Sequence, residues 1–360
     1  MPFFGLRFCM PLFMRYRTKK IITSKIRRAI RWEFWPMPVF YIPIVAYIVF
    51  LTLRFRGLTF LSVNPGLPMS GLIGERKAQS LIQLTGSPFL ARFELVPEHS
   101  SVEHRVDLAT EIIRRLEVDF PVVLKPDFGQ RGADVAVIRS QDEMHKYLSK
   151  TKTTALLQEH IKGEEFGVFY MRYPIDDTNE IYSITEKTFP IVYGDGSSTL
   201  EQLLMSNPRT HYMAEYLLNL HADKLDYVLD NGEAFKAVEI GSHCRGSVFL
   251  DGNQYITPEL TAEIDNVSRQ IEGFHFGRYD IRVDNTELLR TGAGFKILEV
   301  NGVTSESTNV YDPKNSVFDA YRILFKQWRA AFEIGEQAIK MGADKVSIAQ
   351  LLGHLKKTYG

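Results

Sequence analysis

The chain has little cysteine, and its first 32 residues contain no acid. Cys9 and Cys244 are the only cysteines among 360 residues, too few and too far apart for a disulfide framework, which favours a reducing compartment. The formal net charge is zero, which argues against a general nucleic-acid binder. The charge is unevenly placed, because nine lysines and arginines precede the first acid, Glu33.

Charge is also absent from Phe34 to Leu53, "FWPMPVFYIPIVAYIVFLTL". A membrane-spanning helix needs about 20 apolar residues, so the run is just long enough. Its prolines, the last of them Pro43, are expected to leave only Ile44 to Leu53 as uninterrupted helix. A membrane-surface or re-entrant segment is the favoured interpretation, and a true span and a buried soluble helix are the alternatives.

Trp32 and Trp35 stand beside Arg27, Arg28 and Arg31. Indole rings favour the headgroup depth of a bilayer, and cations are attracted to anionic lipid. We therefore expect a cytoplasmic protein associated with the inner face of the membrane, with the lipid surface as a partner.

Composition divides the chain into successive parts. An apolar content of 45% and the length predict two or three structural units. The expected parts are a basic head with the apolar segment (1–57), a Gly- and Pro-rich linker (58–74), a main domain (75–335) and a helical tail (336–360). Within the main domain we expect a glycine-loop part at about 119–170 and a part at about 171–312 that carries the candidate magnesium ligands described below.

A lysine and a glycine loop stand between two predicted strands in "DFPVVLKPDFGQRGADVAVIRS". Lys125 ends the first strand, and the loop contains Gly129, Gln130, Arg131 and Gly132. Glycines let backbone N–H groups approach phosphate oxygens, and a lysine supplies a point charge, so this hairpin is a candidate triphosphate cover. An ordinary hairpin is the alternative, and the pattern is not a P-loop.

The stretch "FKILEVNG" ends an apolar strand with two oxygen donors. Because side chains alternate along a strand, Phe295, Ile297, Glu299 and Asn301 are expected on one face. The alternative is a strand end that simply reaches water.

An upstream strand, "GRYDIRVD", is predicted to pair with it. If the loop 285–294 closes symmetrically, Asp280 lies opposite Glu299 and Arg278 opposite Asn301. Like charges in such a pair need a cation between them, and Mg²⁺ is commonly held by one or two carboxylates together with phosphates. A slip of one residue would turn Asp280 away.

These motifs, with "FKILEVNGVTSEST" and "VYGDGSSTLEQLL", resemble the ATP-grasp superfamily, in particular its carboxylate–amine ligases. The resemblance covers roughly Glu75 to Asp312. It implies an α+β ATP-grasp fold, in which two α/β subdomains grip ATP between them. Relatives of this type carry a Rossmann-like domain before the core, where this sequence has the basic head, the apolar run and the linker.

The resemblance also implies roles for individual residues. It implies phosphate contacts from Lys77 and Lys125 under the Gly129–Gly132 loop, an adenine contact at Glu159, a ribose contact at Glu165, magnesium ligands at Asp280, Glu299 and Asn301, a catalytic arginine at Arg278, and further phosphate or substrate contacts at Lys187 and Arg245.

The implied cofactors are ATP and Mg²⁺, and the implied substrates are a small-molecule carboxylate and an amine joined through an acyl phosphate. A kinase that phosphorylates a small-molecule or lipid-headgroup hydroxyl is the alternative, and a non-catalytic nucleotide-responsive module is a third.

The cluster of Ser305, Ser307 and Thr308 is either a site for a substrate carboxylate or a polar loop.

Overall fold

The computed structural model describes residues 6–72, 74, 76–129, 132–241, 243 and 246–359, and side chains from residue 17 to residue 357 within these ranges. The chain separates into two compact units, each built from two stretches of sequence. Unit 1 consists of Met1–Ile42 and Thr188–Val248, and unit 2 of Pro43–Lys187 and Phe249–Gly360. The boundary at Ile42 falls inside a helix, so the segment 1–57 is divided between the units.

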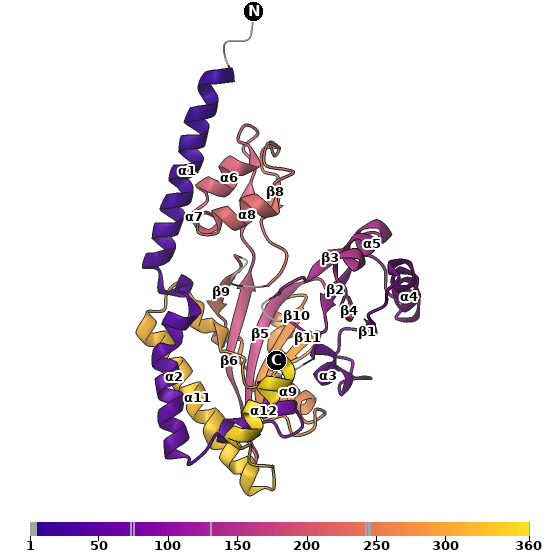
Figure 1. Cartoon of the computed structure of the whole chain (residues 1–360), viewed down its shortest axis with the longest axis vertical. Helices are drawn as coiled ribbons and strands as arrows, with labels where there is room; N and C mark the ends of the chain where they lie inside the picture. Colours follow the sequence, from indigo (N-terminus) through magenta and orange to yellow (C-terminus); the bar gives the residue numbers. More distant parts are fainter. Residues whose placement is uncertain are drawn as a thin grey trace, which may run out of the picture. The chain divides into compact units, whose positions relative to one another are not determined.

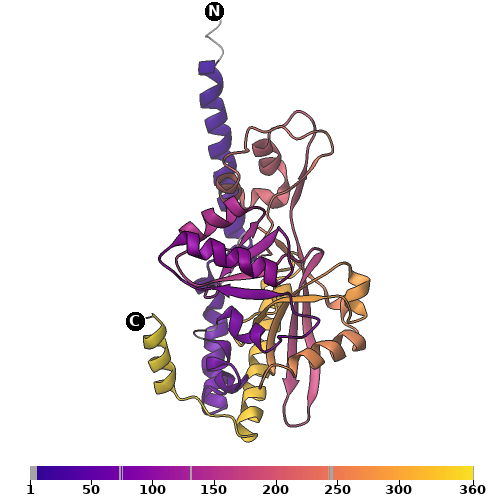
Figure 2. The same ribbon diagram turned by 90° about the vertical axis from the view of Figure 1, so that its right-hand side faces the viewer.

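Unit 2 contains a four-stranded antiparallel sheet in the order β1-β4-β2-β3. Its strands are β1 Phe93–Val96, β2 Val122–Pro126, β3 Ala136–Ile138 and β4 Ala155–Glu159. Helices α4 Val102–Arg115 and α5 Gln141–Lys150 cover one side of this sheet (Figure 2). Both helices are amphipathic, and Ile112 and Leu148 are among the side chains that they bury against the strands.

A five-stranded sheet in the order β11-β10-β5-β6-β9 forms the centre of unit 2. Its strands are β5 Glu164–Tyr173, β6 Thr178–Thr188, β9 Val248–Asp251, β10 Phe276–Val283 and β11 Lys296–Asn301. One face packs on α3 Lys77–Ile82 and α9 Pro258–Ser268. The other packs on α11 Val317–Lys340 and on the part of α2 Met37–Arg54 that follows Pro43, and α2 runs beside α11 (Figure 1).

The face of the sheet towards α11 changes character along β10. At one end Phe276 packs with Phe169 of β5 and with Phe332 of α11. Further along, Arg278, Asp280 and Arg282 continue the same face of the strand. The alternate positions, such as Tyr279, are buried in the core under α9. The charged side chains therefore gather where α11 no longer covers the sheet.

The predicted pairing of β10 with β11 is confirmed. Arg278 lies opposite Asn301 and Asp280 opposite Glu299. Beyond this point the register shifts, because Ile281 lies opposite Ile297 and Leu298 is left out as a β-bulge. The connection also contains a short helix, α10 Thr286–Arg290, so it is not the symmetrical loop that the pairing argument assumed.

The bulge corrects the prediction that Phe295, Ile297, Glu299 and Asn301 share one face. Phe295 and Ile297 are buried in the core together with Val300, whereas Glu299 and Asn301 are not part of it. One extra residue in the strand changes the alternation of side chains after it. The two oxygen donors consequently leave the core face and join the face of Asp280.

Unit 1 combines the N-terminal helix α1 Leu6–Ile30 with the sequence inserted after β6. That insertion contains β7 Ile191–Tyr193, α6 Leu200–Ser206, α7 Pro208–His211, α8 Ala214–Leu220 and β8 Ala234–Lys236. Ser24 donates a hydrogen bond to the carbonyl of Tyr212 at 3.2 Å, and buried Glu33 pairs with Arg209 at 3.2 Å. These contacts join segments that are far apart in the sequence.

Helix α2 runs through Pro43, which corrects the prediction of a helix limited to Ile44–Leu53. Pro43 removes one hydrogen bond and crowds the preceding turn, but its fixed φ angle suits a helix, and buried Ile44 and Leu51 anchor the segment that follows. With 18 residues and a mean hydropathy of 1.8, α2 is long and apolar enough to cross a membrane by length and composition.

Candidate active site

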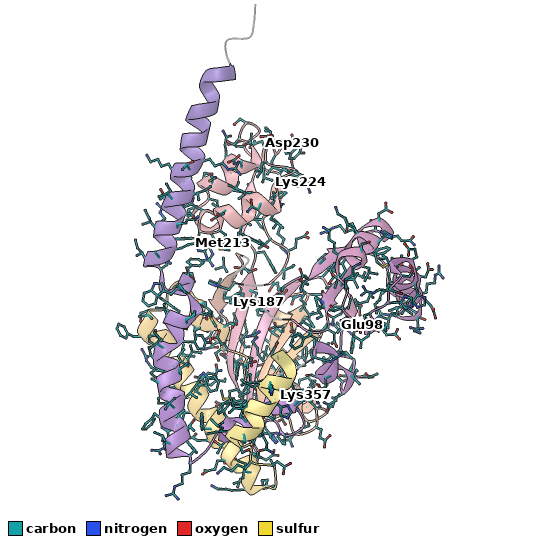
Figure 3. The ribbon with its side chains drawn as sticks, viewed as in Figure 1. Glu98, Lys187, Met213, Lys224, Asp230 and Lys357 are labelled. Atoms are coloured by element: carbon teal, nitrogen blue, oxygen red, sulfur yellow. The ribbon has the colours of Figure 1, made fainter. Side chains whose placement is uncertain are left out.

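The central strands of unit 2 hold a buried network of ion pairs. Glu165 of β5 accepts from Lys187 of β6 at 3.1 Å and from the Nη2 atom of Arg282 of β10 at 2.9 Å. The register places Glu165 opposite both cations, and all three side chains lie on the face towards α11. Figure 3 shows Lys187 at these strands. Although burial acts to raise it, Lys187 and Arg282 hold the pKa of Glu165 below its usual range.

Asp280 continues the network. Its Oδ2 atom lies 3.1 Å from Nζ of Lys187, and its Oδ1 atom accepts from Nε of Arg278 at 2.9 Å. Burial opposes ionisation, but the two cations hold the pKa of Asp280 well below its usual range. Gly167 lies opposite Asp280, where a Cβ atom would stand 3.2 Å from Cδ of Arg278, so a glycine leaves room for these side chains.

Lys77 is fixed at the start of α3. Its backbone N–H donates to the carbonyl of Asp127 at 2.9 Å, and the Asp127 carboxylate accepts from the next N–H of the helix. Its Nζ atom donates to the carbonyl of Gly129 and lies 3.4 Å from Oε1 of Glu299. Lys77 therefore connects the glycine loop to β11.

Lys125 reaches from β2 to the bulge in β11. Its Nζ atom donates to the carbonyl of Leu298 and to Oε1 of Gln158, both at 3.0 Å. Gln158 donates to the same carbonyl at 3.2 Å. Burial lowers the pKa of Lys125, and Glu299 opposes that effect. The bulge thus supplies the acceptor that positions this lysine.

The loop after β11 closes over the charged face. Ser307 accepts from Ser183 of β6 at 3.0 Å, and Thr308 donates to Thr185 at 2.9 Å. These two hydroxyls are therefore engaged with β6, and Ser305 donates to the carbonyl of Gly302. The predicted choice between a carboxylate site and a polar loop stays open.

Among the described residues, three buried polar atoms in or beside this loop have no hydrogen-bond partner: Nδ2 of Asn301, Oε1 of Glu306 and Oδ1 of Asn309. The carbonyl of Glu306 accepts from Arg278 at 3.1 Å, and its Oε2 atom accepts from Tyr311 at 3.1 Å. Burial raises the pKa of Glu306 to about 7, and the hydrogen bond from the Tyr311 hydroxyl only partly opposes this.

The donor set suits a magnesium ion in its chemistry. Mg²⁺ takes oxygen ligands and commonly uses one or two carboxylates together with substrate phosphates, which matches Asp280 and Glu299 with the amide oxygen of Asn301. Within the described residues no group of three or more His, Cys, Asp or Glu side chains forms a metal cluster. A magnesium ion held by these residues would take its other ligands from phosphate oxygens or water.

The structure brings together most of the predicted site residues, but not all. Lys77, Lys125, Glu165, Lys187, Arg278, Asp280, Glu299 and Asn301 belong to this region of unit 2. Glu159 is engaged elsewhere, in a bidentate pair with Arg92 at 3.0 Å. Gly129 and Gly132 have positive φ angles, while Gln130, Arg131 and Arg245 lie outside the described residues. The nucleotide and metal roles of these residues stay predictions.

Sequence reasoning assigned no site role to four residues of this region: Arg282, Gly167, Gln158 and Glu306. Gly167 had a signal, since it interrupts an apolar strand two residues after Glu165, on the same face. Arg282 also had a signal in the sequence, because a residue two positions after Asp280 lies on the same face of the strand. No pattern marked Gln158 or Glu306, because their roles depend on the bulge and on how the loop folds back.

Comparison with known proteins agrees with this fold. Residues 81–172 match the family model of the RimK-like ATP-grasp domain. The resemblance to the ATP-grasp superfamily is therefore confirmed, and the matched family within it is the RimK-like one. No curated protein matches the chain significantly.

Several solved structures are similar. The D-alanine–D-alanine ligase of Bacillus anthracis shares 14% identity at a TM-score of 0.40 and covers 72% of this chain and 69% of its own. The VanG D-Ala:D-Ser ligase of Enterococcus faecalis shares 13% identity at a TM-score of 0.38, and the match covers 71% of this chain and 61% of that one. A bifunctional glutathione synthetase of Pasteurella multocida shares 11% identity at a TM-score of 0.35, and the match covers 71% of this chain and 38% of that one. The chain thus spans less than two thirds of the last two proteins.

Proposed function

We propose that the chain is an ATP-dependent carboxylate–amine ligase that works through an acyl phosphate at the inner face of the cytoplasmic membrane. The observation that supports this most directly is the pairing of Asp280 with Glu299, each carboxylate bound to a lysine. Five cations, Lys77, Lys125, Lys187, Arg278 and Arg282, stand around three carboxylates, Glu165, Asp280 and Glu299. A surplus of buried positive charge suits a polyphosphate.

Each group has a task in this proposal. Lys77 and Lys125 bind phosphate oxygens, and Glu165 receives the ribose hydroxyls. Asp280, Glu299 and Asn301 hold Mg²⁺, which when bound supplies charge neutralisation at the phosphates. Arg278, held by Asp280 and by the carbonyl of Glu306, faces the acyl phosphate. Such a site accelerates the reaction by positioning and charge stabilisation and needs no protein nucleophile.

The reaction has two steps. A carboxylate oxygen of the first substrate attacks the γ-phosphorus of ATP, and the bond to the bridging oxygen breaks to release ADP. The nitrogen of the amine then attacks the acyl carbon, phosphate leaves, and the nitrogen loses a proton. The products are an amide, ADP and phosphate.

The membrane location rests on the N-terminal segment. The first acid is Glu33, after nine cations, and α2 is an apolar helix of 18 residues whose Val45, Val49 and Leu53 are more than half exposed. Exposed aliphatic side chains next to a basic segment favour an anionic lipid surface.

ATP binding by calorimetry, with and without Mg²⁺, tests the nucleotide site. Wild-type protein is expected to bind ATP in a magnesium-dependent way, and Glu299→Ala to lose that dependence. Glu287→Ala is the matched control, since Glu287 is exposed on the same hairpin, in α10. ATP binding that is indifferent to Mg²⁺ and to Glu299 would overturn the proposal.

Product analysis separates the ligase from a kinase. Hydroxylamine converts an acyl phosphate into a hydroxamate, so a ligase supplied with ATP and carboxylic acids is expected to form hydroxamate, ADP and phosphate. A kinase instead leaves the γ-phosphate covalently bound to a hydroxyl of the product, without free phosphate.

A further inference from the structure

We propose that the outer face of α1, defined by Ile22, Ile26 and Ile30, lies flat on an anionic lipid bilayer. This inference rests on the membrane location proposed above and names the surface and the lipid charge that produce it. It concerns unit 1 alone.

The outer face is an apolar stripe open to solvent. Ile22, Ile26 and Ile30 are 53%, 56% and 75% exposed. At 100° per residue they fall within about 80° of the helix circumference, over two turns. Large aliphatic side chains aligned in this way on an exposed helix mark a surface that is covered by something apolar.

The opposite face of α1 is already occupied. Ser24 is buried with its hydroxyl on the carbonyl of Tyr212, and Ile21 packs against Met205, Ala214 and Leu218. Arg17 lies 3.4 Å from Glu201 of α6. Figure 1 shows α1 running along these helices of the insertion. A helix with one face committed to protein cannot be surrounded by lipid, so α1 lies in the plane of a bilayer rather than across it.

The charges beside the stripe identify the partner as anionic. Arg27 and Lys25 lie about 100° to either side of its centre, and Lys19 stands one turn before Ile22. All three are exposed, and Lys25 also pairs with Glu215 at 3.0 Å. No acid precedes Glu33, so nothing on α1 repels lipid phosphates. An apolar stripe with cations on both sides is the pattern of a helix at the interface of an anionic membrane.

Vesicle flotation of the full chain tests this inference. The probes are vesicles of phosphatidylcholine alone and of phosphatidylcholine with phosphatidylglycerol. Wild-type protein is expected to float with the anionic vesicles, and the triple variant Ile22→Ser, Ile26→Ser, Ile30→Ser to bind them at least tenfold more weakly, because it loses the buried aliphatic area.

The matched control is Ile82→Ser, Ile175→Ser, Ile348→Ser. These isoleucines are 55%, 55% and 62% exposed but belong to unit 2. The control is expected to bind as wild type does. Equal binding by the two triple variants would overturn the proposal, as would wild-type binding that is equal on neutral and anionic vesicles or absent from both.

A charge variant completes the test. Lys19→Gln, Arg27→Gln is expected to lose about tenfold in affinity for anionic vesicles, since each cation near a charged surface contributes. Lys314→Gln, Lys326→Gln, two exposed lysines of unit 2, are expected to lose none. Equal effects of the two pairs would contradict the assignment.

Failure of this inference is distinguishable from failure of the ligase proposal. The serine and glutamine variants of α1 are expected to keep wild-type circular dichroism and magnesium-dependent ATP binding. A wild-type protein that floats with anionic vesicles but does not bind ATP overturns only the ligase. A wild-type protein that binds ATP but no vesicle overturns the proposal that the outer face of α1 binds lipid.

Discussion

Three buried carboxyl groups of unit 2 represent two contrasting regions: Glu165 and Asp280 in the central strands, and Glu306 in the loop after β11. In the strands, Glu165 and Asp280 each have two cationic partners, and their pKa values lie below the usual range. In the loop, the partner that the described residues offer the Glu306 carboxyl group is the Tyr311 hydroxyl, and burial raises the pKa of Glu306 to about 7. Burial acts in the same direction on all three, so the partners decide the charge.

The difference shows how one small region serves two requirements. The strands keep a fixed set of charges that is ready for phosphates and metal. The loop keeps a buried carboxyl group, Glu306, whose pKa is raised so that it holds its proton at pH values where Glu165 and Asp280 are ionised. The following predictions test this contrast, from the largest effect to the smallest.

Removal of the shared cation should have the largest effect. Lys187→Met leaves Glu165 and Asp280 buried side by side, each with a single arginine. We expect a loss of about 3 to 5 kcal/mol in the free energy of unfolding, measured by urea denaturation, because breaking a buried pair leaves uncompensated charge. The matched control is Lys326→Met, at an exposed position of α11. A loss below about 1 kcal/mol would show that the network is not a buried one.

Glu306→Gln should change the pH dependence of stability. The folded state holds the proton of Glu306 up to pH about 7, and the unfolded state releases it near the ordinary value of 4.5. Between these pH values the folded state binds more protons, so wild-type stability falls as the pH rises, by up to about 3 kcal/mol.

The glutamine variant lacks this decline, so its stability at pH 7.5 is expected to approach or exceed that of wild type. Urea unfolding at pH 5 and pH 7.5 measures both slopes, and Glu287→Gln, with an exposed side chain, is the control. If the unfolding free energy of Glu306→Gln depends on pH as that of the wild type does, Glu306 is not the group with the raised pKa.

Glu159→Gln should have the smallest effect. Glu159 pairs with Arg92, whose side chain is 46% exposed, so solvent screens the interaction. We expect a loss of roughly 0.2 to 1 kcal/mol in unfolding free energy. The same variant tests the adenine role implied by resemblance, because a large decrease in ATP affinity with little loss of stability would support that role.

The sequence predicted which residues lie opposite one another on the two central strands of the candidate site. Asp280 lies opposite Glu299 and Arg278 opposite Asn301, as alternation along two neighbouring strands suggested, although the symmetrical loop that the argument assumed is absent from the described connection. Lys125 was a candidate phosphate contact for a similarly local reason, since it ends an apolar strand before a glycine loop.

The errors came from features that tertiary packing decides. The bulge at Leu298 changes which residues share a face, and nothing in "FKILEVNG" marks it. Its stability depends on Lys125 and Gln158, which come from another sheet and bind the freed carbonyl. The helix through Pro43 was missed for the same reason, because burial of Ile44 and Leu51 outweighs the lost hydrogen bond.

The composition of unit 1 has a consequence for the order in which the protein folds. Ser24 of α1 and its partner Tyr212 are 188 residues apart, and Ile21 packs on residues of the same insertion. At typical translation rates, roughly 10 to 40 seconds separate the synthesis of α1 from that of its partners. During that interval the inner face of α1 is as exposed as the outer one. A bilayer or a chaperone that reaches the nascent helix first therefore competes with the insertion for it.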